Sequence, residues 1–158
     1  MQRAQESGYV RWFKDIRLDE VASVGGKNAS LGELYSALSG QGIKVPNGFV
    51  LTAPAYRDAL TKANAWQKLH HLLDPMDKRH IGSLRKRAAQ ARNIVYDATD
   101  VAFVRQAIAA AYRELEQEYG ANVAVAVRSS ATAEDLPTAS FAGQHESFLN
   151  RTSFLRNR

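Results

Sequence analysis

Apolar and polar positions in the first part of the chain predict two short strands and two helices. Between residues 31 and 38, apolar side chains recur at i, i+3, i+4 and i+7, so a helix is expected that ends at Gly40. Apolar runs at 10–13 and 49–51 predict short strands. Thr52 is placed as the N-cap of a further helix, whose first turn tolerates a proline.

The rest of the chain predicts more helices, followed by two strands. Apolar residues at steps of three and four mark helical faces through 64–98, with a break at Asp74-Pro75. A third long helix is expected with Thr99 as its N-cap. An apolar run at 123–127 predicts a strand, and residues 144–149 are interpreted as one more strand. A small mixed sheet packed with several helices places the chain in the α+β class.

Composition narrows the range of functions. The chain has 158 residues, enough for one domain with a core, and no cysteine, which excludes disulfides and thiolate chemistry. No apolar run approaches the roughly 18 residues of a membrane helix, and no signal-peptide pattern is present. We therefore expect no membrane partner and a cytoplasmic location.

The charge suits an anionic ligand. The formal net charge is +5 and the sequence pI is about 9.6. The densest basic cluster, Arg85-Lys86-Arg87, is interpreted as a solvated helix face. Basic and aromatic residues do not alternate as they do in single-strand binders, so no specific nucleic-acid partner is expected.

A glycine pair followed by a lysine is the first candidate for anion binding. Gly25 and Gly26 allow a ligand to approach the backbone closely, and Lys27 adds a full charge. The helix that starts here brings free N–H groups to the same place. The spacing differs from that of a P-loop. The alternative interpretation is a helix start with a surface lysine.

A strand end with an arginine and two serines is the second candidate. Arg128 can hold phosphate oxygens bidentately, and the hydroxyls of Ser129 and Ser130 can donate or accept beside it. The alternative is an arginine paired with Glu134 or Asp135, with serines that cap a turn. We interpret the two carboxylates as turn residues, and the four histidines as structural or surface residues.

Three segments in order resemble the motifs of one enzyme family. Residues 24–34 read VGGKNASLGEL, residues 45–49 read VPNGF, and residues 127–144 begin VRSSATAEDLP. They resemble the N-terminal motifs of phosphoenolpyruvate synthases, also called pyruvate, water dikinases. The resemblance implies an ATP-grasp N-terminal lobe at 10–150, after a flexible N-terminus at 1–9 and before an off-family tail at 151–158.

The resemblance also implies nucleotide contacts at the matching motif positions. The expected ATP-binding residues are Lys27, Arg128, Gly143 and Ser147. The expected supports of the phosphate loop are Gly25, Gly26, Ser129 and Ser130. Ser147 stands where relatives often have threonine, so the hydroxyl is kept. His145 replaces a glutamine that is common in the family, so no role is assigned to it.

The family's reaction sets the expected cofactors and partners. By resemblance, such enzymes pass the β-phosphate of ATP to a histidine on a separate domain, and a barrel domain then converts pyruvate to phosphoenolpyruvate. AMP and phosphate are the other products, and Mg²⁺ is required. The second lobe with its metal ligands, the phosphohistidine domain and the barrel have no counterpart in the sequence. We expect a truncated or excised lobe that is inactive alone, carries no catalytic or metal-binding residue, and self-associates through its exposed cleft face.

Two other functions stay open at this point. Rifamycin phosphotransferases share these N-terminal motifs and would phosphorylate an antibiotic, although the run Asn28-Ala29-Ser30 favours the synthase. A non-catalytic remnant that binds nucleotide weakly, or only packs against a partner, is the other alternative.

Overall fold

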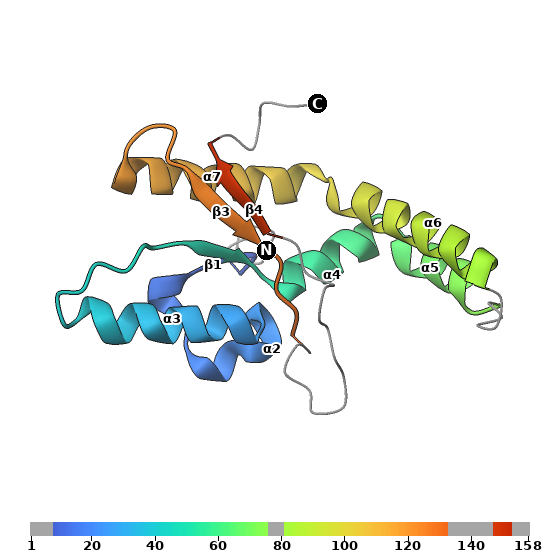
Figure 1. The fold of residues 1–158 in the computed structure, drawn as a ribbon. Coiled ribbons are helices and arrows are strands. Elements are labelled where there is room, and N and C mark those ends of the chain that lie inside the picture. The colour runs from blue at the N-terminus through green and yellow to red at the C-terminus, as the bar shows by residue number, and fades with distance from the viewer. Residues whose placement is uncertain (1–7, 76–80, 133–146, 153–158) are drawn as a thin grey trace.

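The computed structural model of the protein describes residues 8–75, 81–132 and 147–152 (Figure 1). The described residues form short antiparallel strands and helices, which confirms the α+β class. The elements are β1 (Val10–Trp12), η1 (Phe13–Asp15), η2 (Leu18–Glu20), α2 (Val21–Val24), α3 (Gly26–Ser39), β2 (Phe49–Leu51), α4 (Ala53–Lys62), α5 (Ala65–Leu73), α6 (Ile81–Thr99), α7 (Ala102–Tyr119), β3 (Val125–Arg128) and β4 (Ser147–Arg151).

The strands form two antiparallel ribbons within the described part of the chain. β1 pairs with β2, so that Arg11 lies opposite Val50. β3 pairs with β4, and Arg128 lies opposite Ser147. The prediction of one small mixed sheet is therefore wrong for these strands. The apolar pattern marks where strands occur, but backbone hydrogen bonds to a partner decide how they assemble.

The β1–β2 ribbon lies between helices (Figure 1). The β1–β2 ribbon has α3 on one side and α7 on the other, and the β3–β4 ribbon lies beside α7. The core below β1–β2 is a cluster of buried apolar side chains formed by Ile16, Val24, Ala29 and Val50. Gly32 lets α3 approach closely, because a Cβ there would lie 2.7 Å from the Cβ of Ile16.

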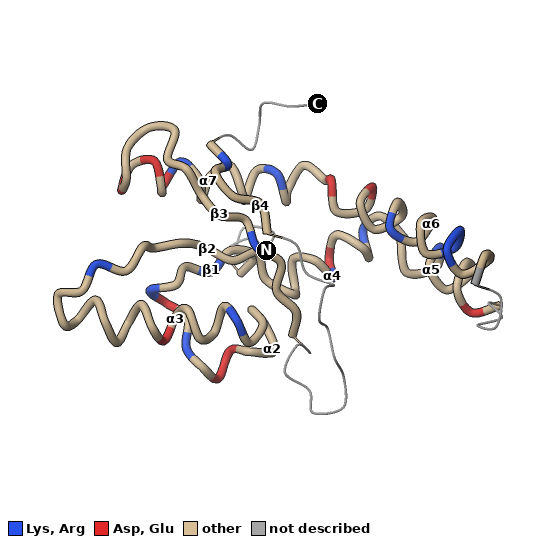
Figure 2. The backbone as a smooth tube through the Cα atoms, in the orientation of Figure 1, with Lys and Arg blue, Asp and Glu red and all other residues tan. Residues whose placement is uncertain are grey.

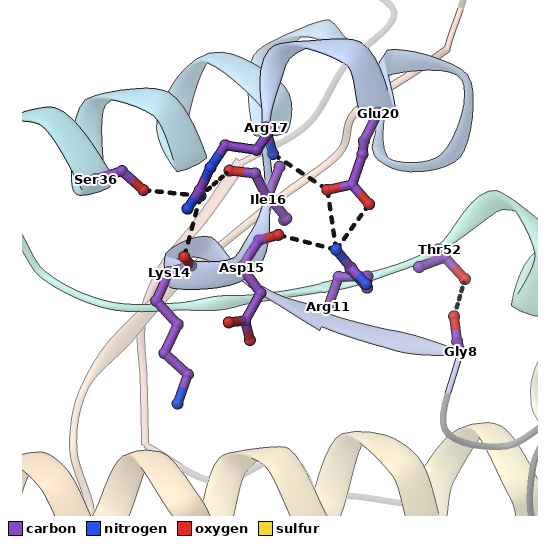
Figure 3. Close-up of polar contacts among 9 residues, drawn as sticks. All are labelled: Gly8, Arg11, Lys14, Asp15, Ile16, Arg17, Glu20, Ser36 and Thr52. Atoms are coloured by element: carbon purple, nitrogen blue, oxygen red, sulfur yellow. Dashed lines mark hydrogen bonds and ion pairs between the residues drawn. The ribbon is translucent and has the colours of Figure 1, made fainter.

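A polar network holds the segment between β1 and α3 in place (Figure 3). The Arg11 guanidinium lies 2.8 Å from the Glu20 carboxylate and also donates to the Asp15 carbonyl oxygen. The same carboxylate accepts a hydrogen bond from the Arg17 backbone N–H at 3.1 Å. The Arg17 side chain donates to the Ser36 hydroxyl on α3 at 2.9 Å. These contacts fix the direction in which the chain enters α2 and α3.

Helices α4, α5 and α6 pack on one another through a second apolar cluster. Its fully buried members are Leu60, Ala65 and Ala98. The predicted N-cap Thr52 is confirmed, since its hydroxyl oxygen accepts a hydrogen bond from the Ala55 N–H. Trp66, at the start of α5, is 42% exposed.

The start of α7 differs from the prediction. Thr99 is the last residue of α6 rather than the N-cap of the next helix, and its hydroxyl donates to the Val95 carbonyl oxygen at 2.9 Å. Val101, which has no side-chain acceptor, occupies the N-cap position of α7. A threonine can bond backward to its own helix as readily as it can cap the next one, and the sequence pattern does not distinguish the two.

Charge is distributed unevenly over the fold (Figure 2). Residues 65–96, which include α5 and most of α6, contain 7 Lys and Arg against 2 Asp and Glu, and the rest of the chain contains 14 of each. The whole net charge of +5 therefore belongs to residues 65–96, which we call the basic hairpin. Arg85 and Lys86 are exposed, as the solvated-face interpretation expects, but Arg87 is half-buried and its guanidinium donates to the Leu72 carbonyl oxygen. None of the helices formed by the described residues has the length and hydropathy to cross a membrane.

Candidate functional site

The first part of the candidate site is the junction between α2 and α3. Gly25 has φ +83°, in the region that favours glycine because a side chain is strained there. This conformation ends α2 and makes Gly25 the N-cap of α3, which begins at Gly26. The unpaired N–H groups of the first turn and the positive end of the helix dipole therefore gather beside Lys27.

The second part is the segment that follows β3. The ammonium of Lys27 donates to the carbonyl oxygen of Ser129 at 3.5 Å. The hydroxyl of Ser130 donates to the Val24 carbonyl oxygen at 3.4 Å. A Cβ on Gly25 would lie 2.3 Å from the Ser130 hydroxyl oxygen. The two motifs that the sequence singled out, about a hundred positions apart, are thus in direct contact.

Arg128 occupies the last position of β3. It is exposed and lies opposite Ser147, the first residue of β4. The antiparallel ladder therefore brings the predicted hydroxyl residue next to the predicted arginine. The segment that follows Arg128 carries the Lys27 contact through Ser129. Three of the four predicted ATP-binding residues are accordingly gathered around the end of the β3–β4 ribbon and the start of α3.

Several predicted residues fall outside the part of the chain that the structure describes. They are Gly143, Glu134, Asp135 and His145. The alternative pairing of Arg128 with a carboxylate of the following turn lies outside it as well. Among the described residues, no three metal-binding side chains are grouped together.

The groups gathered here are of the kinds that can bind an anion. Lys27 is half-buried and Arg128 is exposed, so one charge is partly shielded from solvent and the other is accessible. A guanidinium can hold two phosphate oxygens, and an ammonium and helix N–H groups add donors. Lysine, arginine, serine and backbone groups position and neutralise a polyphosphate, and phosphoryl transfer depends chiefly on these two effects.

Sequence reasoning missed Tyr112, which holds the ribbon at its other end. Its hydroxyl oxygen lies 2.7 Å from the Val123 carbonyl oxygen and 2.8 Å from the Thr152 carbonyl oxygen. Val123 precedes β3 and Thr152 follows β4. The Tyr112 side chain on α7 therefore contacts the chain just before β3 and just after β4. Burial raises the pKa of Tyr112, and the nearby Glu116 charge raises it further. A tyrosine on the inward face of a helix was the available signal, since its hydroxyl needs a partner.

Comparison with known proteins adds to this geometry. Residues 21–155 match the family described as pyruvate phosphate dikinase, AMP/ATP-binding domain. The phosphoenolpyruvate synthase of Escherichia coli (strain K12) is 44% identical over 154 residues, which cover 98% of this chain and 19% of that protein. That of Pseudomonas aeruginosa (strain UCBPP-PA14) is 48% identical over 142 residues, covering 90% and 18%. That of Helicobacter pylori (strain ATCC 700392 / 26695) is 46% identical over 143 residues, covering 90% and 18%. The chain thus spans about a fifth of the length of these relatives.

Proposed function

The chain belongs to the family of pyruvate phosphate dikinase AMP/ATP-binding domains, and from this premise we propose that it is an ATP-binding lobe of ATP-grasp type in a phosphoenolpyruvate synthase. In this proposal Lys27 and Arg128 bind the phosphates of ATP, and Ser147 and Gly143 lie along the nucleotide. Gly25, Gly26 and the two serines after Arg128 support the phosphate-binding backbone. The family match over residues 21–155 includes every one of these residues.

One observation supports the proposal more strongly than any other. The Lys27 ammonium and the Ser129 carbonyl oxygen are 3.5 Å apart, and Arg128 directly precedes Ser129 in the chain. We propose that an anion bound at this junction is held by cations from both motifs. Two cations converging on one place favour a ligand with several phosphate oxygens over a single carboxylate.

The complete reaction is also a proposal. The relatives are named phosphoenolpyruvate synthases, and we propose that this lobe supplies the ATP from which a phosphohistidine is formed, with pyruvate as the final acceptor. The described residues of the site offer cations, hydroxyls and N–H groups, which fit phosphate oxygens and not Mg²⁺, a cation that prefers carboxylate and water oxygens. The proposed contacts of Lys27 and Arg128 are accordingly to phosphate oxygens alone.

Titration of the chain with ATP, AMP and adenosine by calorimetry, with and without Mg²⁺, tests the proposed function. Because the proposed contacts are to phosphates, ATP should bind more tightly than adenosine. Raising the salt concentration should weaken ATP binding, since the contacts are ionic and partly exposed. Equal affinity for ATP and adenosine, or no binding of ATP at millimolar concentration, would contradict the proposal.

Self-association is a second proposal, carried by the surface of the β3–β4 ribbon. Phe148 is 44% exposed and Leu149 is 68% exposed, on neighbouring positions of β4. Exposed apolar side chains on a strand favour contact with another apolar surface. We expect sedimentation equilibrium to show a dimer or larger species, and Leu149→Lys to shift the distribution toward monomer. A wild-type chain that stays monomeric at about 100 μM would contradict the proposal of self-association.

A further inference from the structure

Ser130 lies at the candidate site but is directed at the protein rather than at the place proposed for the phosphates. Its hydroxyl donates to the Val24 carbonyl oxygen at 3.4 Å, and Val24 is the last residue of α2. The carbonyl groups at the end of a helix have no partner within that helix, so donors from outside it satisfy them. The Val24 carbonyl oxygen also accepts a hydrogen bond from the Asn28 side-chain amide at 2.7 Å, so Ser130 supplies its second and longer bond. The serine is half-buried, and Val24 is buried.

The contact around Gly25 leaves no room for a side chain. A Cβ on Gly25 would lie 2.3 Å from the Ser130 hydroxyl oxygen and 2.9 Å from the Ala131 carbonyl oxygen. One of these atoms belongs to the backbone and cannot rotate away. The turn after β3 is therefore seated directly against the backbone that separates α2 from α3.

We infer that Ser130 is a positioning residue, which seats the end of β3 on the α2–α3 junction so that Arg128 and Lys27 are held toward the same anion. This inference rests on the proposed function and assigns Ser130 a role different from phosphate contact. The Ser130 hydroxyl donates its proton to the Val24 carbonyl oxygen. It therefore affects nucleotide binding only through the positions of Lys27 and Arg128. Gly25 is the other half of the contact, because its missing side chain makes the close approach of the turn feasible.

Ser129 provides a matched comparison. It is the neighbouring serine, it is exposed, and its carbonyl oxygen accepts the Lys27 hydrogen bond. Since that contact uses the backbone, Ser129→Ala retains it. Ser129→Ala and Ser130→Ala each remove one hydroxyl oxygen at adjacent positions. Only Ser130→Ala removes the serine bond to Val24, and the Asn28 bond to Val24 stays in both variants.

Two measurements on the whole chain test the inference. Hydrogen exchange follows the Gly25 amide, which donates to Val21, and the Ala29 amide, which donates to Gly25. Calorimetry measures the affinities for ATP and adenosine. Ser130→Ala should speed exchange at both amides and weaken ATP binding by about 2- to 10-fold, the effect of one net hydrogen bond, with adenosine affinity unchanged. Ser129→Ala should leave the exchange rates of both amides as in wild type.

The outcomes separate the inference from the proposed function. If Ser130→Ala weakens ATP binding but leaves exchange unchanged, Ser130 is a direct phosphate ligand and the inference is overturned. If both exchange and ATP affinity stay unchanged, it is overturned as well. A wild-type chain that binds no ATP overturns the proposed function, and the exchange of Gly25 and Ala29 then still decides whether Ser130 seats the turn. Ser130→Thr keeps the hydroxyl and should restore slow exchange, which provides a second variant if Ser130→Ala does not fold.

Discussion

The ammonium nitrogen of Lys27 lies 3.5 Å from the carbonyl oxygen of Ser129, across 102 positions of sequence. The contact joins the first turn of α3 to the residue that follows Arg128. The contact places two separate sequence motifs side by side, so that both can offer hydrogen-bond donors to one ligand. Long-range contacts of this kind carry a large loop-closure cost, so further contacts are needed to maintain them. The seating of the post-β3 turn on Gly25 is the contact that we expect to do so.

Gly25→Ala should be among the more destabilising single substitutions at the site. The new Cβ would meet Ser130 at 2.3 Å and the Ala131 carbonyl oxygen at 2.9 Å, on a backbone with φ +83°. Positive φ and overpacking together cost about 2–5 kcal/mol. Urea unfolding followed by circular dichroism measures this loss of free energy.

Two other glycines separate the causes of that loss. Gly42 has φ +77° but no atom within 4 Å of a Cβ, so Gly42→Ala should cost only the backbone strain of about 1 kcal/mol. Gly40 has φ −64°, and a Cβ there would meet only the Ser36 carbonyl oxygen, at 3.8 Å, so Gly40→Ala should be neutral or stabilise the chain slightly. A loss at Gly25 no larger than that at Gly42 would show that the Ser130 contact is not tight.

Tyr112→Phe should destabilise the chain by about 1 kcal/mol near neutral pH, because the variant loses the hydroxyl that bonds the Val123 or Thr152 carbonyl oxygen. Its effect should also depend on pH. Burial raises the pKa of Tyr112 above its ordinary value of 10.0, so the folded chain keeps a proton that the unfolded chain loses.

The sign of this pH dependence follows from linkage. Where the folded state binds more protons, stability falls as the pH rises, from about pH 10 up through the raised pKa. Wild type should therefore lose part of its stability advantage over Tyr112→Phe as the pH increases from 8 to about 10.5. Urea unfolding of both chains at these two pH values, with tyrosinate absorbance as a check on ionisation, measures the effect. An advantage that stays constant or grows would mean that Tyr112 titrates as an exposed tyrosine does.

Glu20→Ala should cost about 1–2 kcal/mol, more than an average surface ion pair. The Glu20 carboxylate both pairs with Arg11 and accepts the Arg17 N–H, so its loss removes an ion pair and a helix cap together. The side chains of Arg11 and Glu20 are 36% and 27% exposed, and solvent screening keeps the ion pair's own share small. Glu20→Gln keeps an acceptor for Arg17 and should recover part of the loss in a thermal melt.

The basic hairpin should control how the chain binds to a cation exchanger. Residues 65–96 carry the whole excess of positive charge, and Arg85, Lys86 and Arg92 are exposed on α6. Changing these three to Gln should make the chain elute at distinctly lower salt, with little change in melting temperature, since exposed charges contribute little stability. Changing Arg11, Arg105 and Arg113 to Gln removes the same net charge elsewhere. Equal elution shifts for the two triple variants would show that the hairpin has no special part in binding.

The sequence predicted the local structure around the site well. A glycine pair before an i, i+3, i+4, i+7 pattern predicts where α3 begins, and Thr52 before a proline predicts the N-cap of α4; the structure confirms both. These signals are local, because backbone strain and unpaired N–H groups act within one helical turn. The pairing of Lys27 with the Ser129 segment was expected only by joining the two motifs through the family resemblance.

Features that depend on distant partners were harder to predict. The pairing of β3 with β4, and of β1 with β2, is set by strands far apart in the sequence, and a single mixed sheet was predicted instead. The role of Tyr112 depends on two carbonyl oxygens that precede β3 and follow β4. Hydrophobic periodicity places the ring of Tyr112 inward, but it carries no information about which carbonyl oxygens its hydroxyl meets.

The affinity for ATP of wild type, Lys27→Met, Arg128→Met and the double variant tests the central claim most directly. If both cations hold the phosphates of one nucleotide, each single variant should bind ATP about 10- to 100-fold more weakly, with adenosine affinity unchanged. The double variant should lose less than the sum of the two free-energy changes, because the residues share a ligand. The exposed Lys44, which lies in the loop after α3, provides the control Lys44→Met with wild-type affinity. Wild-type ATP affinity in the double variant would contradict the account.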